Sequence, residues 1–286
     1  MIPSIPQPIS FRAAYGAYVV LFFVFLLMPL IVVATFAFND SMFPSLPWGG
    51  FTLDWFFNDT EPRLGLLHDG RLLDSIWTSF FIACWVTVLS VSVGTTNAFL
   101  FERNDFPFKN ALYMLMLLPL VVPGVILGIS ILVFSSTIAN GLERNFGIDL
   151  EFLRPSTFLV IMGQFSFITT ITTLVIAARL RKFDTALEEA AQSLGASKLV
   201  AVWTITIPYL KPAIIGAAIV AFLMSFENFN TTLMLVGSDQ PLTIAMYGRL
   251  REGSTPELNA LSLLLMTVSG GLALLSVFVQ RDKSER

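Results

Sequence analysis

Six apolar runs, each long enough to cross a bilayer as a helix, constrain this chain more than any other feature. A transmembrane helix needs about 20 apolar residues, and a helix pairs its own backbone groups where no water can. Hydrophobic residues make up 55% of the chain and charged residues 13%. We therefore predict an all-α integral membrane protein with six transmembrane helices in one domain, residues 1–286. The runs are residues 15–38, 75–100, 111–134, 155–180, 210–236 and 259–280.

Positive charge indicates how these helices cross the membrane. Most of the 17 Lys and Arg residues fall in segments expected on one side, namely the N-terminus, residues 101–110, residues 181–211 and the tail after residue 280. Cytoplasmic loops carry such an excess. We therefore predict that both termini face the cytoplasm.

The composition argues against the chemistry of soluble enzymes. The single cysteine, Cys84, lies in an apolar run, so no multi-thiol metal site can form within the chain. The single histidine, His68, is interpreted as a solvated loop residue. No Gly-Lys pair occurs, so the usual phosphate-binding loop is missing. We predict no catalytic residue, no resident metal or cofactor, and no nucleic-acid partner.

Residues 184–208 are polar enough to lie outside the membrane and form a predicted helical hairpin. Thr185 and Glu188 have the spacing of a capping box, and Asp184 adds a carboxylate at the same helix end. Gly195 is expected to end this first helix in left-handed geometry.

The second helix of the hairpin has its own start and stop signals. Ser197 is expected to cap it, and the helix is expected to run through Trp203 and to stop at Pro208.

The hairpin contains a motif that resembles the EAA loop of ABC importer permeases. The matching residues are Glu189, Ala190, Ala191, Gly195 after three residues, and Ile205 and Pro208 after nine more. The sequence departs from the family pattern only at Ile207, where leucine is usual. The resemblance implies a coupling hairpin that docks into a groove on a separate ATPase subunit. Glu189 would supply charge or a cap, the two alanines a small face, and Gly195 the bend.

The third apolar run contains two prolines and two glycines, Pro119, Pro123, Gly124 and Gly128. Such residues suggest a broken helix that faces protein rather than lipid, and a simple kink without a role is the alternative. Residues 51–57, rich in aromatic side chains, suggest either an interfacial helix or a loop packed by its own rings.

Glu227 is the one acidic residue expected deep within a span. A carboxylate in hydrocarbon is costly and usually faces a cavity, a partner or a substrate path. With neighbouring amides and rings, it would suit a solute that bears an amine. A structural hydrogen bond to a partner permease is the alternative. The substrate-path candidates are Phe226, Glu227, Asn228, Phe229 and Asn230.

Residues 225–232, 242–247 and 256–262 resemble permeases of spermidine/putrescine importers, and this resemblance covers most of the chain. It departs at Asn228, where that subfamily often has a second acid. It implies a family-like core at residues 75–280 and an additional N-terminal span at residues 15–38. The substrate would be a polyamine, with another organic amine, an amino-acid-like solute or ferric ion as alternatives.

The resemblance also implies an assembly in a bacterial inner membrane. Its members would be a second permease, an ATPase dimer that binds ATP and Mg²⁺, and an external solute-binding protein, all surrounded by lipid. Two other classes remain open: an ion-coupled carrier that uses Glu227 as its coupling group, and a membrane subunit with no transport path.

Overall fold

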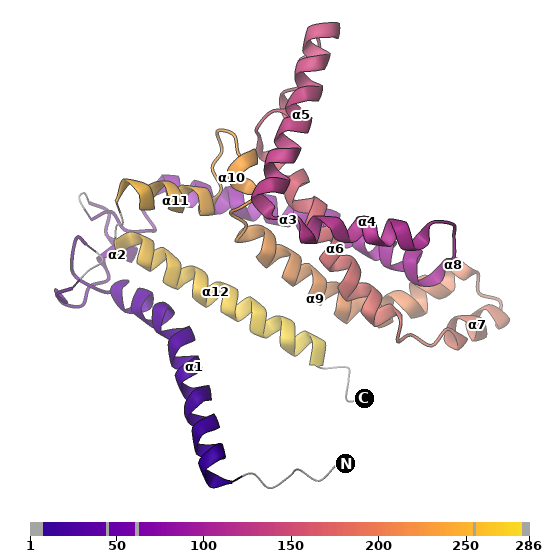
Figure 1. Ribbon diagram of the computed structural model, residues 1–286, viewed down its shortest axis with the longest axis horizontal. Coiled ribbons are helices and arrows are strands. Elements are labelled where there is room, and N and C mark those ends of the chain that lie inside the picture. Colours follow the sequence, from indigo (N-terminus) through magenta and orange to yellow (C-terminus); the bar gives the residue numbers. More distant parts are fainter. Residues whose placement is uncertain (1–7, 44–45, 61–62, 254–255, 282–286) are drawn as a thin grey trace. The chain divides into compact units, whose positions relative to one another are not determined.

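The computed structural model describes residues 8–43, 46–60, 63–253 and 256–281, and these residues form helices and loops without a strand (Figure 1). The all-α prediction is confirmed. In chain order the elements are α1 (Ile9–Phe36), α2 (Asp54–Phe57), α3 (Gly70–Arg103), α4 (Lys109–Val121), α5 (Gly124–Phe146), η1 (Glu151–Leu153), α6 (Thr157–Leu180), α7 (Ala186–Ser193), α8 (Lys198–Ala201), η2 (Val202–Thr206), α9 (Ile207–Phe226), α10 (Thr232–Leu235), α11 (Leu242–Glu252) and α12 (Pro256–Arg281).

Six helical segments of the described chain are long and apolar enough to span a membrane, so the predicted number is confirmed. They are α1, α3, α5, α6, the continuous segment Lys198–Phe226, and Pro256–Leu274 of α12.

The contacts divide the described chain into two compact units. Unit 1 contains the described residues up to Gly70 together with Arg249–Thr267. Unit 2 contains Arg71–Gly248 and α12 from Val268 onward.

The loop after α1 folds around Trp55 in unit 1. This side chain is 3% exposed, and its Nε1 donates a hydrogen bond of 2.8 Å to the carbonyl of Asn39. The rings of Phe38 and Phe51 stack with centroids 5.2 Å apart. Only four residues of this loop, α2, are α-helical. The structure thus favours a loop packed by its own aromatic side chains over an interfacial helix.

Small residues let the helices of unit 2 approach closely. A Cβ at Gly94 of α3 would lie 2.3 Å from Oγ1 of Thr172 on α6. Thr172 in turn donates a hydrogen bond of 2.7 Å to the carbonyl of Ser90 on α3. Polar and small side chains thus hold these two helices together, as is common between membrane helices.

The third apolar run forms two helices, so its predicted bounds are wrong. The chain leaves α4 at Val122, which is extended (φ −74°, ψ 127°), and Pro123 precedes α5. A proline disfavours helical geometry at the residue before it, which explains a break rather than a kink. The membrane-length helix is α5, which extends to Phe146 through residues predicted as a polar loop.

The fifth span also differs from its predicted bounds. The helix that starts at Lys198 does not stop at Pro208, because the π-helical turn η2 precedes the proline and the helix continues as α9. In a π turn each backbone N–H bonds to the carbonyl five residues earlier. The helix passes Pro208 with this changed hydrogen-bond pattern just before it, and continues without a break. At the other end α9 stops at Phe226, ten residues before the predicted end at Val236.

Candidate functional site: the hairpin and the break after α9

The hairpin begins with a cap other than the predicted one. The side chain of Thr185 makes no capping hydrogen bond, and the backbone of Thr185 is already helical. Instead, Oδ1 of Asp184 accepts a hydrogen bond of 3.0 Å from the backbone N–H of Ala186. The predicted capping box between Thr185 and Glu188 is therefore wrong, because Asp184 supplies the cap and Glu188 points elsewhere.

Gly195 ends α7 as predicted. Its φ of +95° lies in the region that favours glycine. The N–H of Gly195 bonds to the carbonyl of Gln192 (2.9 Å), and that of Ala196 bonds to the carbonyl of Ala191 (3.0 Å). This is a Schellman motif, which turns the chain sharply at a helix end. Ser197 then caps α8, as predicted, by accepting a hydrogen bond from the N–H of Val200.

Glu188, which the sequence suggested only as a capping residue, anchors the hairpin. The residue is 8% exposed, and its Oε1 lies 3.2 Å from Nη2 of Arg103 at the end of α3. The same oxygen accepts a hydrogen bond from the hydroxyl of Thr206 in η2. The guanidinium of Arg103 also lies over the ring of Phe183, 5.2 Å from its centroid. One carboxylate therefore joins α3, α7 and η2.

A second ion pair, near the first, joins the end of α3 to the residue that follows α6. Nη2 of Arg181, the residue after α6, lies 2.7 Å from Oε1 of Glu102 on α3. The hydrogen bond with Glu102, and then its charge, raise the pKa of the Arg181 guanidinium above its usual value.

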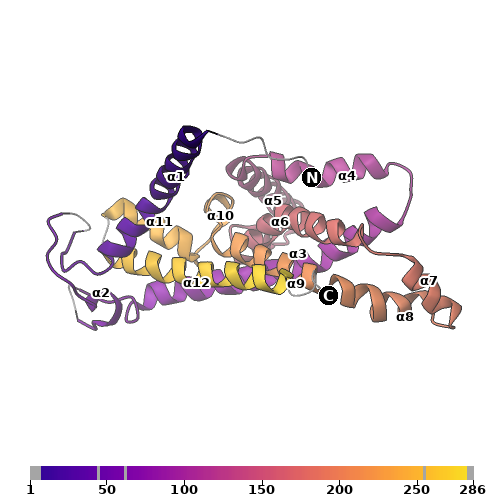
Figure 2. The same ribbon diagram turned by 90° about the horizontal axis from the view of Figure 1, so that it is seen from below.

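The outer face of the hairpin is apolar and open. Figure 2 shows α7 and α8 projecting together beyond the ends of α6 and α9. The family-motif residues Glu189, Ala190 and Pro208 are exposed, while Ala191 and Ile205 are half-buried. Large apolar side chains accompany them, with Leu194 90% exposed. Exposed apolar patches are typical of surfaces that contact another protein or a membrane. The exposed apolar residues are Leu187, Leu194, Leu199, Val200 and Trp203.

Glu227 lies at a helix end, so the prediction that one continuous helix at residues 210–236 contains it is wrong. It follows the last residue of α9, its side chain is exposed, and its Oε1 accepts a hydrogen bond of 2.9 Å from Ser269 on α12. The break has a local cause in Asn228, whose Oδ1 accepts hydrogen bonds from the backbone N–H (3.2 Å) and hydroxyl (2.9 Å) of Thr232. Such side-chain bonds compete with helix continuation.

A buried polar network supports this break. Nε2 of Gln164 on α6 donates a hydrogen bond of 2.8 Å to the hydroxyl of Thr232. Ser225 donates to Oε1 of Gln164, and Thr243 donates to the carbonyl of Asn228 at 2.9 Å. The only sequence signal for this network is a glutamine, Gln164, within an apolar run. Asn228 therefore holds the local backbone, and its side-chain oxygen is already occupied.

The break after α9 lies against the break between α4 and α5. The hydroxyl of Thr231 donates a hydrogen bond of 3.3 Å to the carbonyl of Gly124, the first residue of α5. A Cβ at Gly124 would lie 3.2 Å from Cβ of Asn230, and one at Gly128 would lie 3.0 Å from Cβ of Met234. These glycines face protein, as the sequence suggested, and two irregular segments meet in unit 2.

The predicted aromatic residues do not enclose Glu227 as a pair. Phe226 stacks on Phe222, with centroids 5.8 Å apart, and Phe229 packs against Tyr247 at 5.0 Å. Glu227, Asn228 and Asn230 therefore lie in one irregular segment after α9. The rings of Phe226 and Phe229 instead pack against two different aromatic residues. Within the described residues, no group of three or more His, Cys, Asp or Glu side chains could hold a metal ion.

Comparison with known proteins places the chain among membrane transport components. Residues 90–282 match the family described as "Binding-protein-dependent transport system inner membrane component". The putrescine transport system permease protein PotI of Escherichia coli is 28% identical over 87% of this chain and 84% of its own length. The spermidine/putrescine transport system permease protein PotC of Haemophilus influenzae is 25% identical over 94% of this chain and 97% of its own.

Solved structures show the same fold. A bacterial ABC transporter involved in the import of the acidic polysaccharide alginate matches 96% of this chain and 96% of its own, with a TM-score of 0.75 and 18% identity. An alginate ABC transporter in complex with a periplasmic protein that carries an alginate pentasaccharide matches with a TM-score of 0.71 and 16% identity, over 96% of this chain and 95% of its own.

Proposed function

The chain belongs to the family of binding-protein-dependent transport system inner membrane components, the permeases of ABC importers, and we propose that its solute is a small organic amine of the polyamine class. PotI and PotC, whose names state putrescine and spermidine/putrescine transport, support this choice through their similarity over most of the chain. Glu227, an exposed carboxylate at a helix break, supplies the charge that such a solute requires.

The exposed hairpin is the observation that carries the proposed coupling to ATP. We propose that Leu194, Leu199 and Trp203 dock into a separate ATPase subunit and that Glu189 supplies charge at this contact. ATP and Mg²⁺ would bind to that partner, and this chain would catalyse no reaction. Closure of an ATPase dimer would then draw the hairpins of two permeases together.

Two connections of the hairpin suggest how its movement reaches the membrane. The Glu188–Arg103 ion pair links α7 to α3. The continuous segment Lys198–Phe226 links the docking surface to the residue before Glu227. A displacement at the ATPase contact would therefore reach both α3 and the break that holds Glu227.

We further propose that both termini and the hairpin lie in the cytoplasm of a bacterial cell and that the chain pairs with a second permease in the inner membrane. An external binding protein would deliver the solute from the opposite side. The test of orientation is labelling of single cysteines by a membrane-impermeant maleimide in a Cys84→Ser background. Intact cells should label Asp149→Cys, between α5 and α6, but not Ser193→Cys on the hairpin. The reverse pattern would contradict the orientation.

The function is tested with the complete importer in proteoliposomes, with the binding protein outside and ATP inside. Amine uptake should require ATP and persist when the proton gradient is collapsed, whereas an ion-coupled carrier would show the opposite. Leu199→Glu should abolish coupled uptake while the permease still inserts into the membrane. Stabilisation of the binding protein by anionic or neutral ligands, and not by polyamines, would contradict the substrate class and leave the importer assignment intact.

A further inference from the structure

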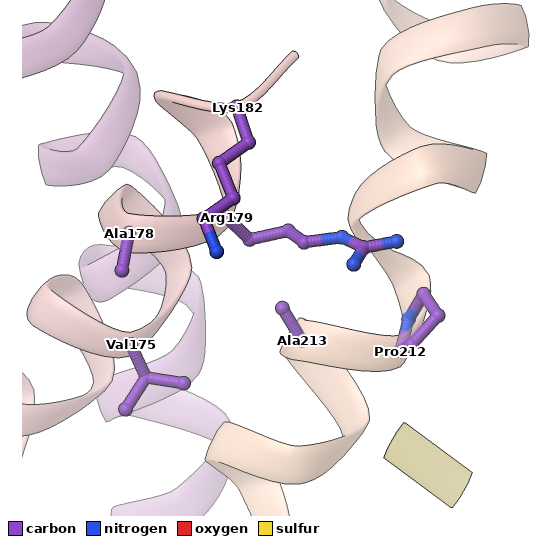
Figure 3. Close-up of a pocket in the computed structure, with 6 residues that line it drawn as sticks. All are labelled: Val175, Ala178, Arg179, Lys182, Pro212 and Ala213. Carbon is purple, nitrogen blue, oxygen red and sulfur yellow. The ribbon is translucent and has the colours of Figure 1, made fainter. Parts of the chain in front are cut away.

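A pocket of about 230 Å³ lies between the last turns of α6 and the first turns of α9, in unit 2 (Figure 3). Its wall is apolar toward the middle of these helices, and two cationic side chains lie at the end nearer the hairpin. In Figure 3 the side chain of Arg179 extends from α6 toward Pro212 on α9. The lining residues are Val175, Ala178, Arg179, Lys182, Pro212 and Ala213.

The two cations of the pocket lack an acidic partner. Nε of Arg179 is buried and has no hydrogen-bond acceptor among the described residues. The central carbon of its guanidinium lies over the ring of Tyr209, 4.3 Å from the centroid. Lys182 makes no ion pair within the ranges that the structure describes. A buried donor without an acceptor is costly, so an acceptor bound in this pocket would be stabilised by it.

Neighbouring cations at the same end of unit 2 differ in this respect. Arg103 pairs with Glu188, Arg181 pairs with Glu102, and Lys109 pairs with Asp105 at 2.9 Å. Cations near the end of a helix also interact with its last carbonyls. That interaction explains why positive residues occur at the end of α6, but it supplies no acceptor for a guanidinium N–H. Lys198 and Lys211 also make no ion pair among the described residues, so what distinguishes the pocket is the buried Nε of Arg179.

We propose that this pocket binds the phosphate group of an anionic membrane lipid. Arg179 and Lys182 would contact the phosphate oxygens, and the lipid chain would lie along Val175, Ala178 and Ala213. Basic pockets between membrane helices bind acidic headgroups, and each nearby cation contributes about 1 kcal/mol to such binding. The last turn of α6 ends a segment that is long and apolar enough to span a membrane, and the headgroups of a bilayer would lie near such an end.

The position of the pocket beside both ends of the hairpin indicates what a bound lipid would do. Arg179 and Lys182 immediately precede the hairpin, and Pro212 and Ala213 follow it at the start of α9. A lipid phosphate that contacts both helices would hold together the two ends of the segment that carries α7 and α8. This proposal does not depend on the transported solute or on the ATPase contact.

The test is native mass spectrometry of the full chain in detergent, titrated with phosphatidylglycerol and, separately, with zwitterionic phosphatidylethanolamine. Phosphatidylglycerol should bind more tightly, and Arg179→Gln and Lys182→Gln should each weaken it about five-fold. Lys109→Gln is the matched control, because Lys109 is at the same end of unit 2 but pairs with Asp105. Thermal unfolding of each variant shows whether it is folded. Lys182 is exposed, so Lys182→Gln should stay folded and provides the test if Arg179→Gln unfolds.

Three results would overturn the proposal. The first is equal binding of the two lipids. The second is a loss of affinity in Lys109→Gln as large as in Lys182→Gln. The third is displacement of the lipid by soluble glycerol phosphate at equal concentration, which would identify the ligand as a free phosphate compound.

Discussion

Nη2 of Arg103 lies 3.2 Å from Oε1 of Glu188, in an ion pair between the last residue of α3 and the first turns of α7. The two residues are 85 positions apart, and their side chains are 22% and 10% exposed. Such a pair fixes the hairpin to a membrane span. Glu189, the next residue, is exposed and free to contact another chain. Adjacent glutamates thus have different surroundings, one buried within the chain and one exposed at its surface.

The first prediction compares these two glutamates. Glu188→Ala should lower the unfolding free energy by about 1–3 kcal/mol, because Arg103 and Thr206 lose a buried charged partner. Glu189→Ala should change it by less than about 0.5 kcal/mol, because its side chain is exposed. Thermal unfolding in detergent measures the difference. Equal melting temperatures for the two variants would show that the ion pair does not anchor the hairpin.

The second prediction concerns the turn of the hairpin. Gly195→Ala should cost about 1 kcal/mol, since φ is +95° there although nothing lies within 4 Å of the added Cβ. Gly141→Ala is the control, because Gly141 lies inside α5 with equally open surroundings. That change should stabilise the chain by about 0.5–1 kcal/mol. Unfolding measurements on both variants should therefore differ in sign, and the same sign would contradict the left-handed turn.

The third prediction tests the polar network behind the break after α9. Gln164→Leu should destabilise the chain by about 1–3 kcal/mol, because the buried hydroxyls of Ser225 and Thr232 lose their partner. Gln240→Leu, at an exposed position, serves as the control. Denaturant unfolding should separate the two variants. A neutral effect of Gln164→Leu would mean that the two hydroxyls find other partners.

The fourth prediction separates the charge of Glu227 from its hydrogen bond. Glu227→Gln keeps an acceptor for Ser269 but removes the charge, so the solute concentration for half-maximal uptake should rise about ten-fold. Ser269→Ala keeps the charge and should leave that concentration nearly unchanged. Uptake by the complete importer provides the measurement. Similar effects of both variants would indicate that Glu227 acts only as a structural group.

Features with a local cause could be predicted from the sequence. The number of spans follows from the lengths of apolar runs, and the turn at Gly195 follows from the left-handed geometry that ends helices. The caps illustrate the limit, because Asp184 and Thr185 both suit a helix start and only the folded chain selects Asp184. Hydropathy alone also misplaced α5, whose start depends on how Pro123 acts on Val122.

Features that need a distant partner could not be predicted. The role of Glu188 depends on Arg103, and the end of α9 depends on Gln164 from α6. Apolar residues on both sides of residues 225–232 led to one predicted run at residues 210–236, which placed Glu227 inside a helix. The polar side chains in that window instead bond to each other and to α6, and these bonds offset the loss of helical hydrogen bonds.

The π turn η2 also has a rotational consequence. A π turn accommodates one more residue than an α-helical turn, and one residue corresponds to about 100° of rotation about the helix axis. The direction in which α8 presents Leu199 is therefore offset from the direction in which α9 presents the residues that pack on α6. If one residue of Val202–Thr206 were deleted, a regular helix could form. If the deleted residue were not Trp203, every exposed apolar side chain of the hairpin would remain, but these side chains would point in a different direction around the helix axis. The direction in which the hairpin presents its exposed side chains thus depends on the number of residues in a single turn.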